Sequence, residues 1–271
     1  MIKRLCIISS LILALSACAS QHQNSVDTTN LYQLETLTQQ NTPLPEGQGI
    51  SNIRLQALKE VATSIGAQGG LAFQAGRIDD QLQAQSRTLD SVFNFQGMLL
   101  AHNVLPPVLE QGDQLVNLND NDTIRIADKT YKIVQQARFV TNAPNWRQYL
   151  WMSYKKPALP DQTLLPRNDA EREVWIKHVR AGWKQGIMQA KNMYAANLAR
   201  LKRDYNGMVL YRELLTRNMV SKPFVAQANL GVTSNSSDSQ LYINDKVLRI
   251  TALPKLNPKS TQWKAVVTHE Q

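Results

Sequence analysis

The chain has 271 residues, a formal net charge of +9 and a hydrophobic content of 43%. These values exclude a chain too short or too polar to bury a core, and they allow one or two domains. The basic balance favours anionic neighbours, such as acidic partner proteins, peptidoglycan, lipopolysaccharide or nucleic acid, although ordinary solubility charge is the simplest explanation.

The first 18 residues have the pattern of a lipoprotein signal peptide. Two basic residues precede an apolar run from Leu5 to Leu15, and the lipobox Leu15-Ser16-Ala17-Cys18 completes the pattern. The run has about 11 residues, whereas a membrane-spanning helix needs about 20. We therefore expect residues 1–17 to be removed and Cys18 to be acylated. Because Ala19 rather than aspartate follows the cysteine, we expect the lipid to hold the protein at the outer membrane, facing the periplasm.

The mature chain is expected to have a flexible N-terminus and a loose C-terminus. Residues 18–48 are polar and rich in Gln, Asn and Thr, which predicts an acylated tether. A globular domain is predicted over residues 49–258. Residues 259–271 are polar apart from Trp263 and predict a loosely ordered tail.

Helical patterns open the predicted domain. Residues 52–65 place four apolar side chains on one helical face, namely Leu58, Val61, Ala62 and Ile65. We expect the glycines of residues 66–70 to end this helix, and a weaker second helix to cover residues 71–92. Residues 93–100 predict a strand that leads into Pro106-Pro107.

Two similar segments predict β-hairpins. Residues 123–140 alternate apolar and polar side chains on both sides of a predicted turn at Ala127-Asp128-Lys129. Residues 123–133 also align without a gap to residues 240–250. Turn chemistry alone explains the likeness, and a true repeat is the alternative. We expect both hairpins to pair within one sheet.

The strongest helical pattern follows Pro166. Asn168 and Glu171 form a capping box, and an apolar stripe then runs from Val179 to Met208. We expect a kink at Asn206-Gly207. The stripe indicates core packing, with a partner groove as the alternative. The whole pattern predicts an α+β fold, in which a small antiparallel sheet built from hairpins packs with long amphipathic helices.

The sequence shows no catalytic constellation. Cys6 leaves with the signal peptide, so the mature chain keeps no thiol for a disulfide, a nucleophile or a metal. The remaining histidines lack a second ligand at metal spacing, and the carboxylates of Asp79-Asp80 diverge on a helix. We therefore expect no catalytic residue, no metal and no cofactor, and we predict that the protein is not an enzyme. A glycan hydrolase with two carboxylates distant in sequence is the alternative.

Residues 146–157 crowd aromatic and basic side chains into one segment. Trp, Tyr, Met and Arg are enriched in binding hot spots, which makes five residues candidates for a partner interface: Trp146, Arg147, Tyr149, Trp151 and Tyr154. A place in the core fits equally well if the indole and phenol groups find hydrogen-bond partners. A lipid-facing aromatic belt is a third option.

Eight strings of the chain are long and distinctive: residues 66–70, 102–108, 136–141, 146–157, 164–166, 170–175, 197–203 and 248–258. Through them, the region from about residue 50 to residue 258 resembles the DotC lipoproteins of type IVB (Dot/Icm) secretion systems. It also resembles their counterparts, the TraI lipoproteins of IncI-type conjugative plasmids.

This resemblance implies a structural subunit in the outer-membrane part of a secretion core complex, within a multi-subunit ring. Proteins of this kind act with a DotD-like lipoprotein and help to bring a DotH-like subunit to the outer membrane. The resemblance implies no catalysis, and the one site it transfers is the lipidated Cys18. Peptidoglycan is a further candidate partner, and no direct nucleic-acid binding is expected. A periplasmic lipoprotein that binds or processes the cell wall is the alternative function.

Overall fold

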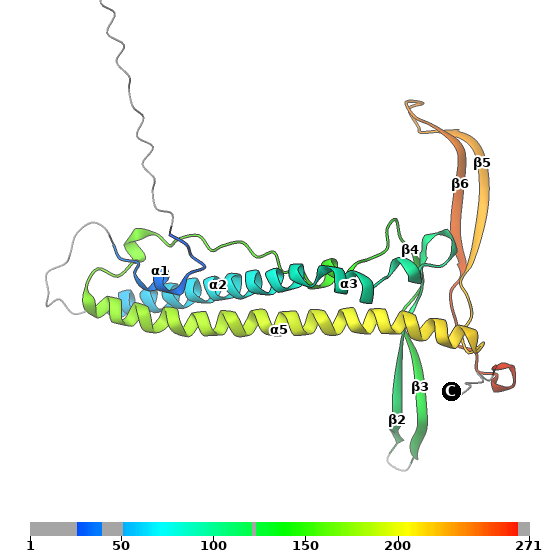
Figure 1. Ribbon diagram of the computed structural model, residues 1–271, viewed down its shortest axis with the longest axis horizontal. Helices are drawn as coiled ribbons and strands as arrows, with labels where there is room; N and C mark the ends of the chain where they lie inside the picture. The colour runs from blue at the N-terminus through cyan, green and yellow to red at the C-terminus, as the bar shows by residue number, and fades with distance from the viewer. Residues whose placement is uncertain (1–25, 40–50, 121–122, 265–271) are drawn as a thin grey trace, which may run out of the picture.

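Two long helices lying side by side dominate the molecule (Figure 1). The computed structural model describes residues 26–39, 51–120 and 123–264. Helix α2 covers Asn52–Ala84 and helix α5 covers Asp169–Thr216. Both run in the same direction, so residues 151–166 must lead the chain back along the pair before α5 begins (Figure 1). Among the described residues, no helix combines the length and the apolar character needed to cross a membrane.

Glycines allow α2 and α5 to touch backbone to backbone. A Cβ atom added at Gly66 would lie 2.3 Å from the carbonyl oxygen of Val179, and one at Gly186 would lie 2.1 Å from that of Ala67. Gly70 and Gly182 are equally tight, which gives each helix a pair of glycines four residues apart. The prediction that these glycines end the first helix is therefore wrong. Close packing offsets their low helix propensity, about 1 kcal/mol each, and α2 continues to Ala84.

The predicted start of the long helix is confirmed. The side chain of Asn168 accepts a hydrogen bond from the backbone N–H of Glu171, at 2.9 Å. The predicted kink at Asn206-Gly207 is wrong, because α5 continues through both residues to Thr216. Gly207 instead makes room for a crossing strand, since a Cβ there would lie 2.7 Å from the carbonyl oxygen of Leu109.

Residues 26–39 pack against the start of the helical pair. They include the short helix α1, Leu31–Glu35, whose Leu34 is fully buried. The indole N–H of Trp175 donates to the carbonyl oxygen of Leu34 at 2.8 Å, and the hydroxyl of Thr28 donates to that of Pro157. The prediction of a flexible tether is therefore wrong over this stretch. The rest of the predicted tether, the signal peptide and Cys18 lie outside the described residues.

The strands form three separate antiparallel pairs. Strand β1 (Val104–Leu105) pairs with β4 (Arg138–Phe139), β2 (Val108–Asp120) with β3 (Thr123–Gln135), and β5 (Phe224–Ser234) with β6 (Leu241–Ala252). The α+β class is confirmed, but the prediction that two hairpins share one sheet is wrong. The predicted turn at 127–129 is also wrong, because β3 is continuous there and Lys129 pairs with Asp113.

The two similar segments of the sequence occupy equivalent places in the structure. Residues 123–133 belong to β3 and residues 240–250 largely to β6, and each is the returning strand of its own hairpin. Each hairpin also contains one residue with left-handed backbone angles. Gln114, at φ 54°, lies in β2 opposite the first segment, and Asn244, at φ 57°, lies within the second. The two segments thus share their alternating pattern because each forms the second strand of a hairpin, although the two hairpins are separate sheets.

Short elements complete the fold at both ends of the helical pair, and the turn at Gln162–Leu164 lies beside the start of α2, where Arg54 donates to the carbonyl oxygen of Thr163. The short elements are α3 (Ser86–Val92), α4 (Trp146–Leu150) and four 3₁₀ turns, η1 (Gln96–Met98), η2 (Ala101–Asn103), η3 (Gln162–Leu164) and η4 (Ser260–Gln262). The strand predicted over 93–100 is wrong, because the segment turns at η1 so that Phe95 can enter the core, 1% exposed.

The segment after Pro258 is bound to the end of α5 as far as it is described. The backbone N–H of Lys264 donates to Arg217 at 2.9 Å, and the amide of Asn218 donates to Gln262 at 2.9 Å. The structure thus differs from the predicted loose tail over residues 259–264.

Candidate assembly surface

Two β-hairpins project to opposite sides of one end of the helical pair (Figure 1). We call β2–β3 arm A and β5–β6 arm B. Each arm is a sheet of only two strands, so within the described residues its outer edges pair with no other strand. A two-stranded sheet standing alone is marginally stable in water. The arms are therefore elements that a partner surface would stabilise.

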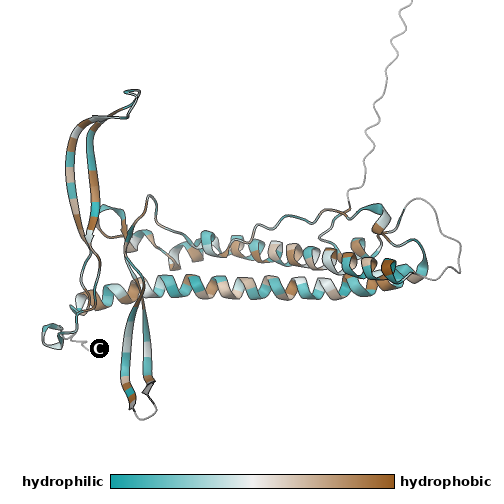
Figure 2. Cartoon of the chain, turned by 180° about the vertical axis from the view of Figure 1, so that it is seen from behind, coloured by the Kyte–Doolittle hydropathy of each residue, from teal (hydrophilic) through white to brown (hydrophobic). Residues whose placement is uncertain are grey.

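Both arms carry hydrophobic residues along their length, as the hydropathy colouring shows (Figure 2). Ile126 of arm A is 71% exposed, and Ile243 and Val232 of arm B are 75% and 65% exposed. Further exposed apolar residues are Leu115, Val116 and Ile124 on arm A, and Phe224, Leu230, Leu241, Tyr242, Val247 and Leu248 on arm B. Exposed apolar side chains in this number on two projecting hairpins indicate an interaction site.

Arm A is firmly rooted on α5. Leu109, at its base, is buried against Tyr211 and Leu214 of the helix. At the other strand of the base, the side-chain amide of Gln135 donates to Asp204. Asp204 also accepts from the Tyr149 hydroxyl at 3.0 Å, and burial together with this carboxylate raises the pKa of Tyr149 to about 12. The root is thus fixed while the outer part of the arm stands in solvent.

The aromatic segment of residues 146–157 divides between core and surface. Trp146 is fully buried, and its indole N–H donates to Asp90 at 2.7 Å. The guanidinium of Arg147 pairs with the same Asp90 carboxylate and covers the Trp146 ring at 4.3 Å. Tyr149 stacks on Phe95. The core interpretation therefore holds for Trp146 and Tyr149, whose polar groups find partners as a core position requires.

Two aromatic members of the segment are open to solvent. Trp151 is 41% exposed and Tyr154 is 40% exposed. The intervening Met152 is buried, and its backbone N–H donates to Asp79 at 2.9 Å, which fixes the segment to α2. Of the five candidate interface residues, Trp151 and Tyr154 thus present an aromatic surface on a fixed backbone.

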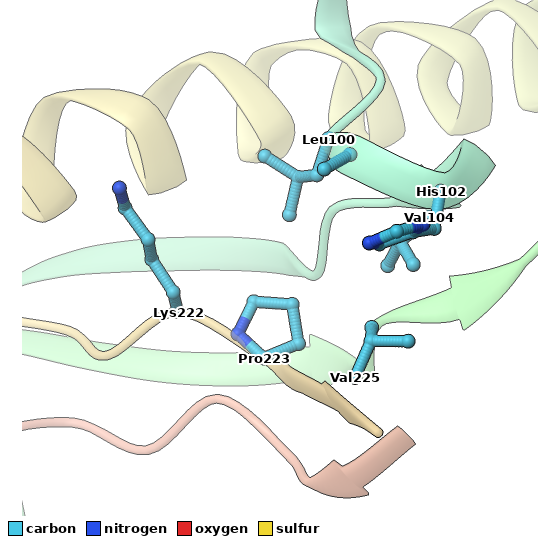
Figure 3. A pocket seen from close by; sticks show the side chains of 7 residues that line it. Leu100, His102, Val104, Lys222, Pro223 and Val225 are labelled. Carbon is cyan, nitrogen blue, oxygen red and sulfur yellow. The ribbon is translucent and has the colours of Figure 1, made fainter. Parts of the chain in front are cut away.

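A pocket of about 310 Å³ lies where arm B meets the helices (Figure 3). Its walls are the turn of residues 100–104 and the start of arm B at residues 222–225. Apolar side chains form most of the lining, and His102 and Lys222 supply the polar groups (Figure 3).

The turn that carries His102 is strained. His102 and Asn103 both adopt left-handed backbone angles, with φ of 61° and 54°. Such angles cost about 1–3 kcal/mol per non-glycine residue and persist only where the surroundings fix them. Here the N–H of Leu100 donates to Val104 at 2.9 Å, and that of Val140 donates to Asn103 at 3.0 Å. The histidine is thus held at the pocket wall.

Few sequence patterns indicate these surfaces. The apolar run Leu241-Tyr242-Ile243 was one signal, because consecutive apolar residues on a strand point to both faces. The pocket had none, because its two walls are about 120 residues apart. Cys18 lies outside the described residues, and within the described ranges no group of three metal-binding side chains comes together.

Comparison with known families gives one match. A family model described as "Type IV secretory system, conjugal DNA-protein transfer" matches residues 52–265. The matched region contains both long helices, both arms and the pocket. No curated protein matches the chain.

Proposed function

We propose a structural role in an outer-membrane assembly, from the premise that this chain belongs to the TraI family of type IV secretory systems for conjugal DNA–protein transfer. The family match confirms the resemblance found in the sequence and makes the protein a component of type IV secretion or conjugation. The finer role that we propose is that of an outer-membrane lipoprotein anchored through Cys18. Together with a DotD-like lipoprotein, it would localise a DotH-like subunit to the outer membrane within the core complex.

The two arms carry this proposal. Arm A is rooted on α5, arm B follows the end of α5 through the buried Val220, and both arms expose apolar side chains. An enzyme needs convergent polar groups in a cleft, whereas an assembly subunit needs extended surfaces that neighbours can cover. The arms supply surfaces of the second kind.

Charged substitutions on the arms test the proposal. Ile126→Asp on arm A and Ile243→Asp on arm B each replace an exposed apolar side chain, so neither should disturb folding. Each should reduce the amount of DotH-like subunit in the outer-membrane fraction, and the frequency of transfer, by about tenfold or more if it lies in an interface core.

Met188→Asp is the matched control, because Met188 is a 57% exposed apolar residue of α5 away from the arms. It should leave partner localisation and transfer near the wild-type level. Normal transfer by both arm variants, at normal protein abundance, would show that the arms do not dock a partner.

A further inference from the structure

Strand β5 has an edge that is open to strand pairing. Its 11 residues, Phe224–Ser234, contain no charged residue and no proline. The other three arm strands carry charges, namely Glu110, Asp113 and Asp120 on β2, Arg125, Asp128, Lys129 and Lys132 on β3, and Asp245, Lys246 and Arg249 on β6. Because charges, prolines and bulges are devices that natural proteins use to block exposed edges, the stretch of residues 225–229, which precedes the register shift between Asn229 and Gly231, is the part of β5 without such protection.

The pocket lies at the N-terminal end of this edge. Its lining comes from residues 100–104 and 222–225 and includes no residue of β6, so it opens on the side of β5 that faces away from its partner strand (Figure 3). A chain laid along the free edge of β5 would therefore run into the pocket at the base of arm B.

The lining chemistry suits an apolar side chain next to a carboxylate. Leu100, Val104 and Val225 offer apolar contacts, while Lys222 and His102 stand at its two ends (Figure 3). No carboxylate is present among the lining residues that the structure describes. The ammonium of Lys222 and the imidazole of His102 can each donate a hydrogen bond to an anionic group.

We infer that the pocket and the free edge of β5 form one peptide-binding site, which takes an extended segment of another subunit as an added antiparallel strand. An antiparallel strand ends where β5 begins, so the carboxylate at its C-terminal end enters the pocket between His102 and Lys222. Backbone hydrogen bonds along β5 supply affinity, and the pocket selects the terminal residue. The origin of the segment in a secretion subunit rests on the proposed function. The chemistry of binding is independent of it.

Peptide binding to the full mature chain carrying Cys18→Ser tests this site. The probe is a fluorescent peptide of alternating threonine and valine that ends in leucine, followed by anisotropy. Three forms are compared: a free C-terminal carboxylate, a C-terminal amide, and an amide with aspartate after the leucine. Tighter binding of the first form alone assigns the pocket to a chain terminus, and tighter binding of the third assigns it to an acidic side chain. Equal binding by all three forms, or none, overturns the inference.

Two matched pairs of variants locate the binding. Lys222→Met should weaken the carboxylate form about tenfold, whereas Lys246→Met on β6 should leave it unchanged. Ala228→Lys places a charge on β5 and should weaken every form, whereas Val247→Lys, at the paired position on β6, should not. Thermal melting confirms that all four variants are folded. Loss of binding in the β6 variants alone would contradict the assignment.

The peptide experiment needs no partner subunit and no membrane. A negative result would leave the outer-membrane localisation test untouched, and a failure of that test would leave a measured peptide affinity standing.

Discussion

Glu171 lies 1% exposed in the first turn of α5, where two arginines hold its carboxylate. Arg54 of α2 reaches it at 3.0 Å and Arg167 at 2.9 Å, and the backbone N–H of Arg167 adds a further bond. Burial alone raises the pKa of this carboxyl, but the hydrogen bonds from Arg54 and Arg167 outweigh it and lower the pKa from 4.5 to about 2. The ion pair thus ties the start of α5 to the start of α2.

Acid should remove this contribution in a defined range. Because the folded-state pKa is depressed, the stabilisation is complete above the unfolded-state value of 4.5 and is lost as the pH falls toward about 2. Glu171→Gln should lower the free energy of unfolding by about 2–3 kcal/mol at neutral pH. Urea titrations of both proteins between pH 7 and pH 3 should converge at the acid end, and parallel curves would contradict the assignment.

The glycine contacts between α2 and α5 can be tested one residue at a time. In Gly186→Ala the new Cβ meets the Ala67 carbonyl oxygen at 2.1 Å, so the helices must separate. We expect a loss of about 1–3 kcal/mol in the free energy of unfolding. Gly76→Ala is the control, because a Cβ there has nothing within 4 Å, and higher helix propensity should stabilise it by up to about 1 kcal/mol. Equal effects of the two variants would show that the glycine contact is unimportant.

At the scale of the element, local rules predicted what local forces decide. The capped start of α5 and its apolar stripe were correct, because capping and helical periodicity act within a few residues of one another. The prediction that α2 ends at the glycines of residues 66–70 was wrong. Gly66 and Gly70 are tolerated because they pack against α5, which is more than a hundred residues away in sequence. The turn predicted at residues 127–129 was wrong because β3 continues there, paired across to β2, whose distant partner residues turn chemistry does not reveal.

The aromatic segment shows how one short element can serve the core and the surface. Trp146→Ala removes a fully buried indole and should cost about 3–5 kcal/mol of stability. Trp151→Ala removes a side chain that is 41% exposed, so it should change the free energy of unfolding by less than about 1 kcal/mol. Thermal melting separates the two. If Trp151 also contacts a partner, its variant should melt normally and still reduce recovery of the complex.

At the scale of the whole molecule, the structure places its features at two ends. Residues 26–39 and the start of both long helices lie at one end, and both arms and the pocket lie at the other (Figure 1). The α+β class and the long helices could be predicted from sequence. The placement of residues 26–39 and the arms at opposite ends could not be predicted. It depends on the parallel direction of α2 and α5, which the glycine contacts fix.

Removing the proposed lipid should separate anchoring from folding. Cys18→Ser should leave thermal melting of the mature chain unchanged, because within the described residues the packing against the helices begins at Val26. It should move the protein from the membrane to the soluble fraction and abolish outer-membrane recovery of the DotH-like subunit. Retention of both in the membrane fraction would show that lipidation is not the working anchor.

Because residues 26–39 pack against the helices, the distance between Cys18 and the folded domain is limited. Between Cys18 and Val26 there are eight residue steps, which reach at most about 28 Å when extended. Helix α5 alone is 48 residues long, or about 72 Å. A lipid on Cys18 would therefore be joined to one end of the helical pair by a segment of at most about 28 Å, whereas α5 is more than twice as long. The distance from the membrane to the arms would then be set mainly by the length of the helices, and the short segment after Cys18 could change it only a little.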